Sequence, residues 1–459
     1  MSRGIGRGIG RGLGTYVRIV AHGPAGRPFT AAVVARLPIS MAPLGIVLLV
    51  QETTGSYGLA GTVTGAFAFA NAVGAPLCGK ALDRWGQPRV MVATSVFSAV
   101  FLAALAVASI QPLSTPLLCG LSALSGLTFP PMTPAMRAAW RVALREPVQQ
   151  RAAYALDAVA VETIFIAGPL LLSLLLVVTP PVAPLLVTAG LMVVGGLAYS
   201  TTSAARQAHA HALAQLAAEP GAAAPPPRRG RVNWDRLLPP SLVLVLVVSL
   251  GMAMAFGAID TSLAATARDV LGDQAKLGLL FASIAGGSAL GGLWFGTRDV
   301  SHSTQVRLLP LLLLAFACGF APIAVVLGGA TPTLAVLSPL LFLTGMSISP
   351  TLIILQNLVD EAAPAGRTNE GQAWLATSVT TGVGVGTAAA GILVDIAGVP
   401  WSFAGAGCAA LASAATAGVL RGRHARRVWP SRAAPGPQVT QPSPSAAQGS
   451  NPWASERKP

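Results

Sequence analysis

The chain has 459 residues, of which 53% are hydrophobic and only 10% are charged. Soluble globular proteins carry about 25% charged residues, and a soluble chain of this length would need several polar domain surfaces. This composition cannot cover such surfaces, which excludes a soluble protein. Most of the chain is therefore expected to lie in lipid.

Twelve apolar runs are each long enough to cross a bilayer as a helix, which takes about 20 residues. In chain order they are residues 28–51, 57–78, 90–110, 115–136, 153–178, 182–201, 240–265, 276–297, 306–328, 332–356, 371–397 and 400–421. They lack the alternating pattern of a membrane β-barrel, and a backbone in hydrocarbon must satisfy its own hydrogen bonds. The runs predict an all-α membrane protein with 12 transmembrane helices.

Polar segments divide these helices into two groups of six. The expected parts are a basic, disordered N-terminal arm (1–27), an N-terminal bundle (28–201), an Ala/Pro/Arg-rich linker (202–239), a C-terminal bundle (240–421), and a tail that is basic and then Pro/Ser-rich (422–459). Two bundles of six helices joined by a polar linker are typical of transporters built from repeated halves.

The distribution of basic residues predicts the orientation in the membrane. Nearly all of the 30 Lys and Arg residues fall in the arm, the tail and the even-numbered connections. The positive-inside rule then places both termini in the cytoplasm. The net charge of +14 describes a surface beside anionic lipid headgroups, so no nucleic-acid partner is expected. Arg far outnumbers Lys, and both Ala and Gly are abundant, which suggests a bacterial origin. We expect a multi-pass, monomeric protein of the bacterial inner membrane.

A short connection after the second run, GKALDRWGQPRV, carries one carboxylate among three cations. It resembles the signature of the major facilitator superfamily at that connection, Gly-x-x-x-Asp-Arg-x-Gly-x-[Lys/Arg]. The matching positions are Gly79, Asp83, Arg84, Gly86 and Arg89. Pro88 stands where the family usually has a second basic residue. The resemblance covers residues 28 to 421.

This resemblance implies the fold of that superfamily, two six-helix pseudo-repeats that work by alternating access. It also implies that the turn acts as a cytoplasmic latch, in which Asp83 holds the two halves together. The alternative is a simple topology anchor, in which Arg84 and Arg89 only fix the turn on the inner side.

Ionisable residues inside the spans are functional candidates because they are costly in hydrocarbon. Arg36, Glu162 and Asp260 are the proton-coupling candidates. Glu162 lies about ten residues into its helix, and Arg36 is its expected partner; a buried structural pair is the alternative. Asp157 is expected at the cytoplasmic rim and Asp395 at a wetted span end.

The substrate cavity between the two bundles is expected to be lined by few charged side chains. The substrate-cavity candidates are Met41, Asn71, Met252, Phe256, Gln356 and Trp374. Met and aromatic side chains suit a small amphipathic molecule. Glycine pairs four residues apart, Gly287/Gly291 and Gly382/Gly386, predict close helix packing.

The resemblance extends to the drug and sugar efflux branches of the superfamily. We therefore expect proton-driven export of a small molecule, with no metal and no cofactor besides the proton gradient. The fourth span lacks the Arg that many proton-driven members carry, which leaves an importer or facilitator open as the alternative. An enzyme is not expected, because the five histidines lie in tails and loops without acid or Cys partners.

Overall fold

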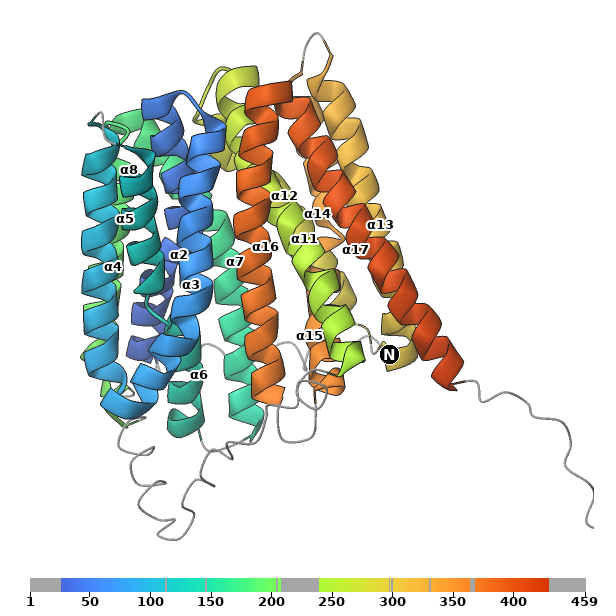
Figure 1. Ribbon diagram of the computed structural model, residues 1–459. Helices are drawn as coiled ribbons and strands as arrows, with labels where there is room; N and C mark the ends of the chain where they lie inside the picture. Colours follow the sequence, from blue (N-terminus) through green and yellow to red (C-terminus); the bar gives the residue numbers. More distant parts are fainter. Residues whose placement is uncertain are drawn as a thin grey trace, which may run out of the picture.

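The structure is a computed structural model that describes residues 26–111, 114–144, 147–203, 205–207, 239–296, 298, 300–329, 332–363 and 368–428. Every regular element within these residues is a helix (Figure 1). The predicted arm up to residue 25, most of the predicted linker and the tail beyond residue 428 lie outside the described residues. The backbones of Asp83 and Glu162 are described, but their side chains are not.

Two bundles follow each other along the chain. The first contains α2 (Gly26–Thr54), α3 (Tyr57–Trp85), α4 (Gln87–Ser109), α5 (Thr115–Leu127), α6 (Met132–Ala143), α7 (Pro147–Val178) and α8 (Ala183–Ser200). The second contains α11 (Pro240–Ala265), the π-helical turn η1 (Thr266–Val270), α12 (Lys276–Gly296), α13 (His302–Leu327), α14 (Leu334–Gly345), α15 (Ile348–Ala362), α16 (Thr368–Ala397) and α17 (Val399–Val428).

Ten stretches of the described chain are helical, long and apolar enough to cross a membrane. Two predicted spans are formed differently. The run 153–178 lies within α7, whose apolar part is Thr163–Val178. The run 115–136 is divided between α5 and α6. The prediction of an all-α, multi-pass membrane protein is confirmed.

Two spans predicted as single helices are in fact broken. Residues Thr128–Pro131 separate α5 from α6, and Met346 and Ser347 separate α14 from α15. The same residue pattern surrounds both breaks: LSGLTFPP at 124–131 and LTGMSISP at 343–350. Proline removes a backbone donor and clashes with the preceding turn, which explains an interruption at this point.

Glycines hold both broken spans against a neighbouring helix in the same way. A Cβ atom on Gly126 would lie 2.1 Å from the carbonyl oxygen of Phe67 on α3. A Cβ atom on Gly345 would lie 2.1 Å from the carbonyl oxygen of Ile284 on α12. Only glycine permits such backbone contact. The two bundles therefore repeat one architecture, as expected of pseudo-repeats.

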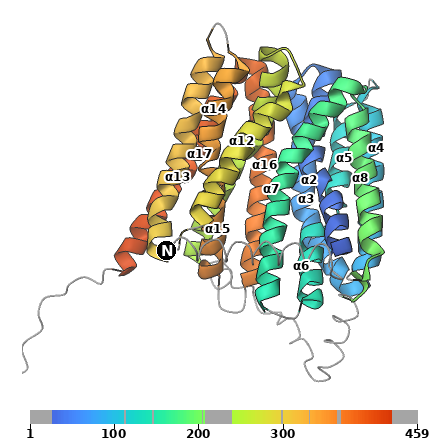
Figure 2. The same cartoon turned by 180° about the vertical axis from the view of Figure 1, so that it is seen from behind.

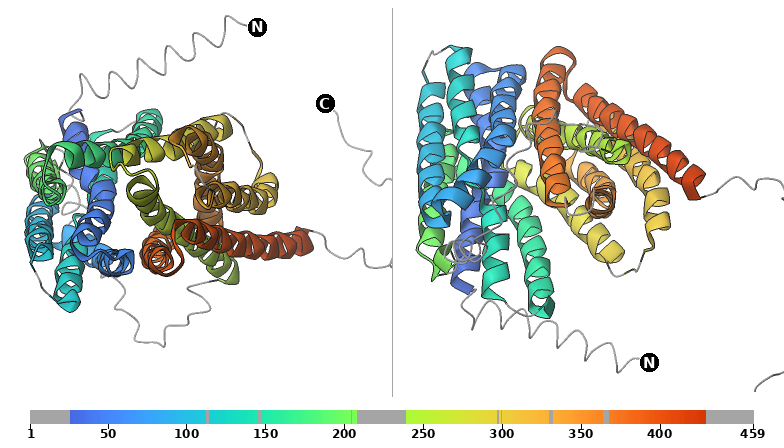
Figure 3. Two further views of the ribbon diagram at one scale, coloured as in Figure 1. Left: turned by 90° about the horizontal axis from the view of Figure 1, so that it is seen from above. Right: turned by 60° about the horizontal axis from the view of Figure 1, so that its bottom comes forward.

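The two bundles approach each other at one face of the membrane domain. We call the face that holds Gly26 the near face and the face that holds Gly55 the far face. Helices α3 and α16 lie side by side toward the far face and diverge toward the near face (Figure 1). Helices α7 and α12 do the same on the other side of the molecule (Figure 2), and the view from above shows the two bundles next to each other (Figure 3).

Candidate functional site

A buried ion pair lies inside the first bundle. Arg36 Nη1 on α2 donates to Asp157 Oδ1 on α7 over 2.5 Å, and both side chains are almost completely buried. Arg36 Nε and Nη2 are also buried and have no hydrogen-bond partner in the described part of the chain. Among the described residues, the pair thus leaves two of the three guanidinium nitrogens without a partner.

Small residues bring α2 close enough for this pair to form. A Cβ on Gly168 of α7 would overlap Ser40 of α2, 2.0 Å from its Oγ. That hydroxyl donates to the carbonyl oxygen of Ile164 over 3.0 Å. On another side of α2, a Cβ on Gly195 of α8 would lie 2.4 Å from Ala35 Cα. Helix α2 is therefore held against α8 directly beside Arg36 and against α7 one turn further on.

The structure shows an ionic partner of Arg36 that the sequence analysis did not assign to it. The sequence predicted Glu162 as the partner and placed Asp157 at the cytoplasmic rim; in the structure Asp157 is buried and paired with Arg36. Residues 157 and 162 point about 140° apart around one helix, since each residue turns by about 100°. The side chain of Glu162 lies outside the described part, and its coupling role stays a prediction.

Asp260 lies in the second bundle, toward the far-face end of α11. It is partly buried, and no hydrogen bond or ion pair engages it within the described residues. Phe256, one turn earlier on the same face, packs its ring 5.7 Å from that of Phe316 on α13. Among the described residues, the acid of the second bundle is therefore unpaired, whereas that of the first is paired.

The turn between α3 and α4 is anchored in the bundle by a residue that the sequence analysis did not single out. Gly86 adopts φ +84°, which ends α3, and Gln87 then points inward and is buried. Gln87 Nε2 donates to the carbonyl oxygen of Ala135 (3.4 Å), and Gln87 Oε1 accepts from the hydroxyl of buried Tyr199 (3.1 Å). Gln87 directly follows Gly86, and this position beside the turn glycine is the sequence signal that could have found it.

The cations of the same turn are exposed. Arg84 lies over the ring of Trp85, 5.6 Å from its centroid, and Arg89 faces outward. Gly79 has open space where a Cβ would be. The proposed latch role of Asp83 stays a prediction, since its side chain lies outside the described part.

The predicted cavity residues occupy different environments. Met41 and Met252 are fully buried in the core, so they line no open surface in this conformation. Asn71 is half-buried at the middle of α3. Gln356 and Trp374 are exposed toward the near face, and Gln372 Nε2 donates to the carbonyl oxygen of Gln356 over 3.3 Å.

Hydrogen bonds and an ion pair join the bundles at the far face. Arg268 of η1 contacts both Gln51 and Glu52 at the end of α2. Asp395 at the end of α16 accepts hydrogen bonds from the first residues of α3. The sequence analysis gave these residues no role.

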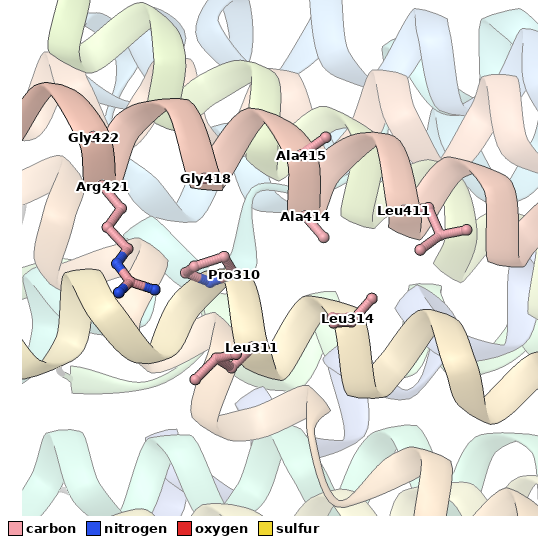
Figure 4. Close-up of a pocket in the computed structure, with 9 residues that line it drawn as sticks. All are labelled: Pro310, Leu311, Leu314, Leu411, Ala414, Ala415, Gly418, Arg421 and Gly422. Carbon is pink, nitrogen blue, oxygen red and sulfur yellow. The ribbon is translucent and has the colours of Figure 1, made fainter.

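A groove away from the candidate residues could also hold a ligand. A groove of about 580 Å³ runs between α13 and α17 and is lined by apolar residues such as Leu311 and Leu411, with Arg421 at one end (Figure 4). It contains none of the candidate residues. Within the described part of the chain, no group of three His, Cys, Asp or Glu side chains is placed to hold a metal ion.

Comparison with known proteins identifies the family. Residues 29–378 match the sequence profile of the Major Facilitator Superfamily. The chain belongs to the Major Facilitator Superfamily. This membership and the fold make it a secondary transporter rather than an enzyme, and they confirm the resemblance found at residues 79–90. The efflux branch stays a prediction.

Solved structures of other transporters share the fold. A peptide transporter POT in complex with sulfate has a TM-score of 0.61 and 14% identity, over 86% of this chain and 94% of that one. A nucleoside transporter NupG mutant has a TM-score of 0.59 and 14% identity, over 86% and 98%. A POT family transporter in complex with a thioalcohol-conjugated peptide has a TM-score of 0.62 and 11% identity, over 87% and 96%. No curated protein is similar enough in sequence to count as a match.

Proposed function

We propose that this transporter couples the movement of a small amphipathic molecule to a proton gradient and exports that molecule by alternating access. The observation that carries the proposal is the buried pair of Arg36 and Asp157. A buried ion pair often adds no stability over apolar residues of similar size, and ionisable groups within spans are functional by default. The pair therefore has a use beyond holding α2 to α7.

The chemistry of the pair suits coupling. Protonation of Asp157 removes its negative charge and frees the guanidinium of Arg36. The unused Nε and Nη2 donors of Arg36 can then bind a second carboxylate or an acceptor on the cargo. Asp260 supplies an unpaired carboxylate in the other bundle, so charge can change on both sides of the transport path.

The proposed orientation places the near face in the cytoplasm of a bacterial cell. It rests on the distribution of Lys and Arg, which favours cytoplasmic termini. In the described conformation the bundles are joined at the far face and diverge at the near face. With this orientation, the transporter is closed to the outside and poised to take up cargo from the cytoplasm.

Import is the second candidate, and one observation favours it. The solved structures that share the fold include a peptide transporter and a nucleoside transporter. Uptake of a small peptide-like or nucleoside-like molecule would use the same two bundles and the same ionisable residues. The two candidates differ in the direction of proton flow relative to cargo.

Proton flux in proteoliposomes separates these candidates. The purified transporter is reconstituted with a trapped pH-sensitive dye, and dipeptides, nucleosides and amphipathic dyes are added outside. Antiport, which export requires, raises the internal pH as cargo enters, whereas symport lowers it. Cargo entry without a pH change in either direction would overturn proton coupling.

Variants test which acids carry the proton. We expect Asp157→Asn and Glu162→Gln to abolish cargo-driven proton flux while cargo counterflow, which needs no net proton movement, continues. Asp360→Asn is the matched control, because Asp360 is exposed and its one hydrogen bond among the described residues comes from Gln372. If every acid variant kept the full proton flux, these residues would have no part in coupling.

A further inference from the structure

The signature of the α3–α4 turn occurs a second time, at the far face. Residues 79–88 read GKALDRWGQP, and residues 391–400 read GILVDIAGVP. Both share the spacing Gly-x-x-x-Asp-x-x-Gly-x-Pro. Both end one helix and begin the next, and their second glycines have similar positive φ angles, +84° at Gly86 and +90° at Gly398. The second copy carries no cation, so a topology anchor does not account for it.

The acid of this second copy caps a helix of the other bundle. Asp395 Oδ1 accepts from the Tyr57 N–H (2.9 Å), and Oδ2 accepts from the Gly58 N–H (2.8 Å) and from Ser56 Oγ (2.6 Å). The first N–H groups of a helix have no partner within the helix, and the positive end of the helix dipole favours an anion. Asp395 therefore bonds the N-terminus of α3 although it belongs to α16.

The first glycine of the copy makes this contact possible. A Cβ on Gly391 would lie 2.1 Å from the carbonyl oxygen of Tyr57, and a Cβ on Gly58 would lie 3.0 Å from Asp395 Oδ2. One turn separates Gly391 from Asp395. The spacing of the motif thus combines a glycine that lets two backbones touch with an acid that reaches the helix end beside them.

Helices α3 and α16 run in opposite directions across the membrane domain. At the far face, the C-terminal end of α16 meets the N-terminal end of α3. At the near face, Asp83 lies at the C-terminal end of α3, on the same face as the start of α16 at Thr368. The repeated motif therefore places one acid at each end of a single helix pair.

We propose that Asp395, with Ser56, Tyr57 and Gly58, forms a far-face latch that must open in every transport cycle, and that it is the counterpart of Asp83. The far-face latch closes the conformation described here. This inference rests on the alternating-access part of the proposed function.

Distance measurement between spin labels tests the far-face latch without any cargo. The four native cysteines are replaced by serine, and labels are placed at the exposed far-face positions Ser114 and Thr333, one in each bundle. The parent should show one main distance. In Asp395→Ala a second, longer distance should appear, with the ratio of far-open to far-closed molecules raised about tenfold, in keeping with the loss of charge-assisted hydrogen bonds.

The control is Asp273→Ala, an acid of the far face whose carboxylate bonds the Ala275 N–H in its own loop; it should leave the distances unchanged. Asp395→Asn loses the charge but keeps a hydrogen-bond acceptor, so it should give a smaller share of the longer distance than Asp395→Ala. This variant replaces Asp395→Ala in the test if the alanine variant fails to fold. Unchanged distances in the folded Asp395 variants would overturn the latch. If the parent protein failed to transport any cargo in proteoliposomes, the proposed function would be contradicted but the latch would not. The distance measurement on the latch needs no cargo.

Discussion

Arg36 uses only one of its three nitrogens to bind Asp157, and the other two are buried without a partner in the described part of the chain. A pair of this kind is asymmetric in its response to substitution. Removing one member leaves an unpaired charge or a row of unsatisfied donors, whereas removing both leaves an apolar contact.

Single replacement of Asp157 by Leu should therefore lower the free energy of unfolding by about 3–5 kcal/mol, because Arg36 would stay buried and charged. The double variant Arg36→Met/Asp157→Leu should recover most of that loss. Denaturant unfolding in detergent, followed by tryptophan fluorescence, measures both. A double variant as unstable as the single one would show that the pair itself stabilises the bundle.

A side chain at Gly391 should keep the far face from closing. The Cβ of Gly391→Val would meet the backbone of α3, which cannot move aside as a flexible side chain could. We expect the spin-label pair at Ser114 and Thr333 to show a larger share of the longer, far-open distance in this variant. Gly120→Val, at a position with open space around its Cβ, is the control and should keep the parental distances.

The ion pair of Arg268 and Glu52 should matter much less than Asp395. Both side chains are partly exposed, 28% and 36%, and exposed pairs contribute about 0–1 kcal/mol. Glu52→Gln should change the spin-label distances at the far face only slightly, and 1 M salt should remove that difference. An effect as large as that of Asp395→Ala would make the ion pair the main far-face contact.

Replacement of Gln87 should loosen the α3–α4 turn. Gln87→Leu leaves the Tyr199 hydroxyl and the Ala135 carbonyl without their partner, at a cost of about 1–3 kcal/mol. Tyr199→Phe removes the other end of one of these bonds. A double-mutant cycle of unfolding free energies should show coupling between the two residues; strictly additive values would contradict the hydrogen bond.

The sequence predicted the helices well where hydrophobicity alone sets their ends. The run 240–265 coincides with α11, and the run 276–297 ends one residue beyond α12. Helix α17 continues to Val428, seven residues past its apolar run, because Arg-rich residues can stay helical outside lipid. The break before Met132 was missed because a hydropathy count treats Pro130 and Pro131 as neutral, although each removes a backbone donor.

The candidate site could be predicted only in part. The cost of a charge in hydrocarbon singled out Arg36 without any structure. Its partner depends on which side of α7 faces α2, and hydropathy does not report this. Asp395 was set aside because it lies at a span end, yet its spacing from Gly391 and Gly398 repeats that of residues 79–86. Comparison of the two turns would have found it.

The contact between α3 and α16 is made largely by glycines, with Gly61 against Thr387 and Gly65 against Gly384. Backbone touches backbone there, so the two helices carry no interlocking side chains that would have to disengage when they part. Parting of these helices therefore depends on backbone contacts and on the hydrogen bonds of Asp395, and not on the size or shape of interlocking side chains. Larger residues at Gly61 or Gly65 would change the movement of the two halves directly.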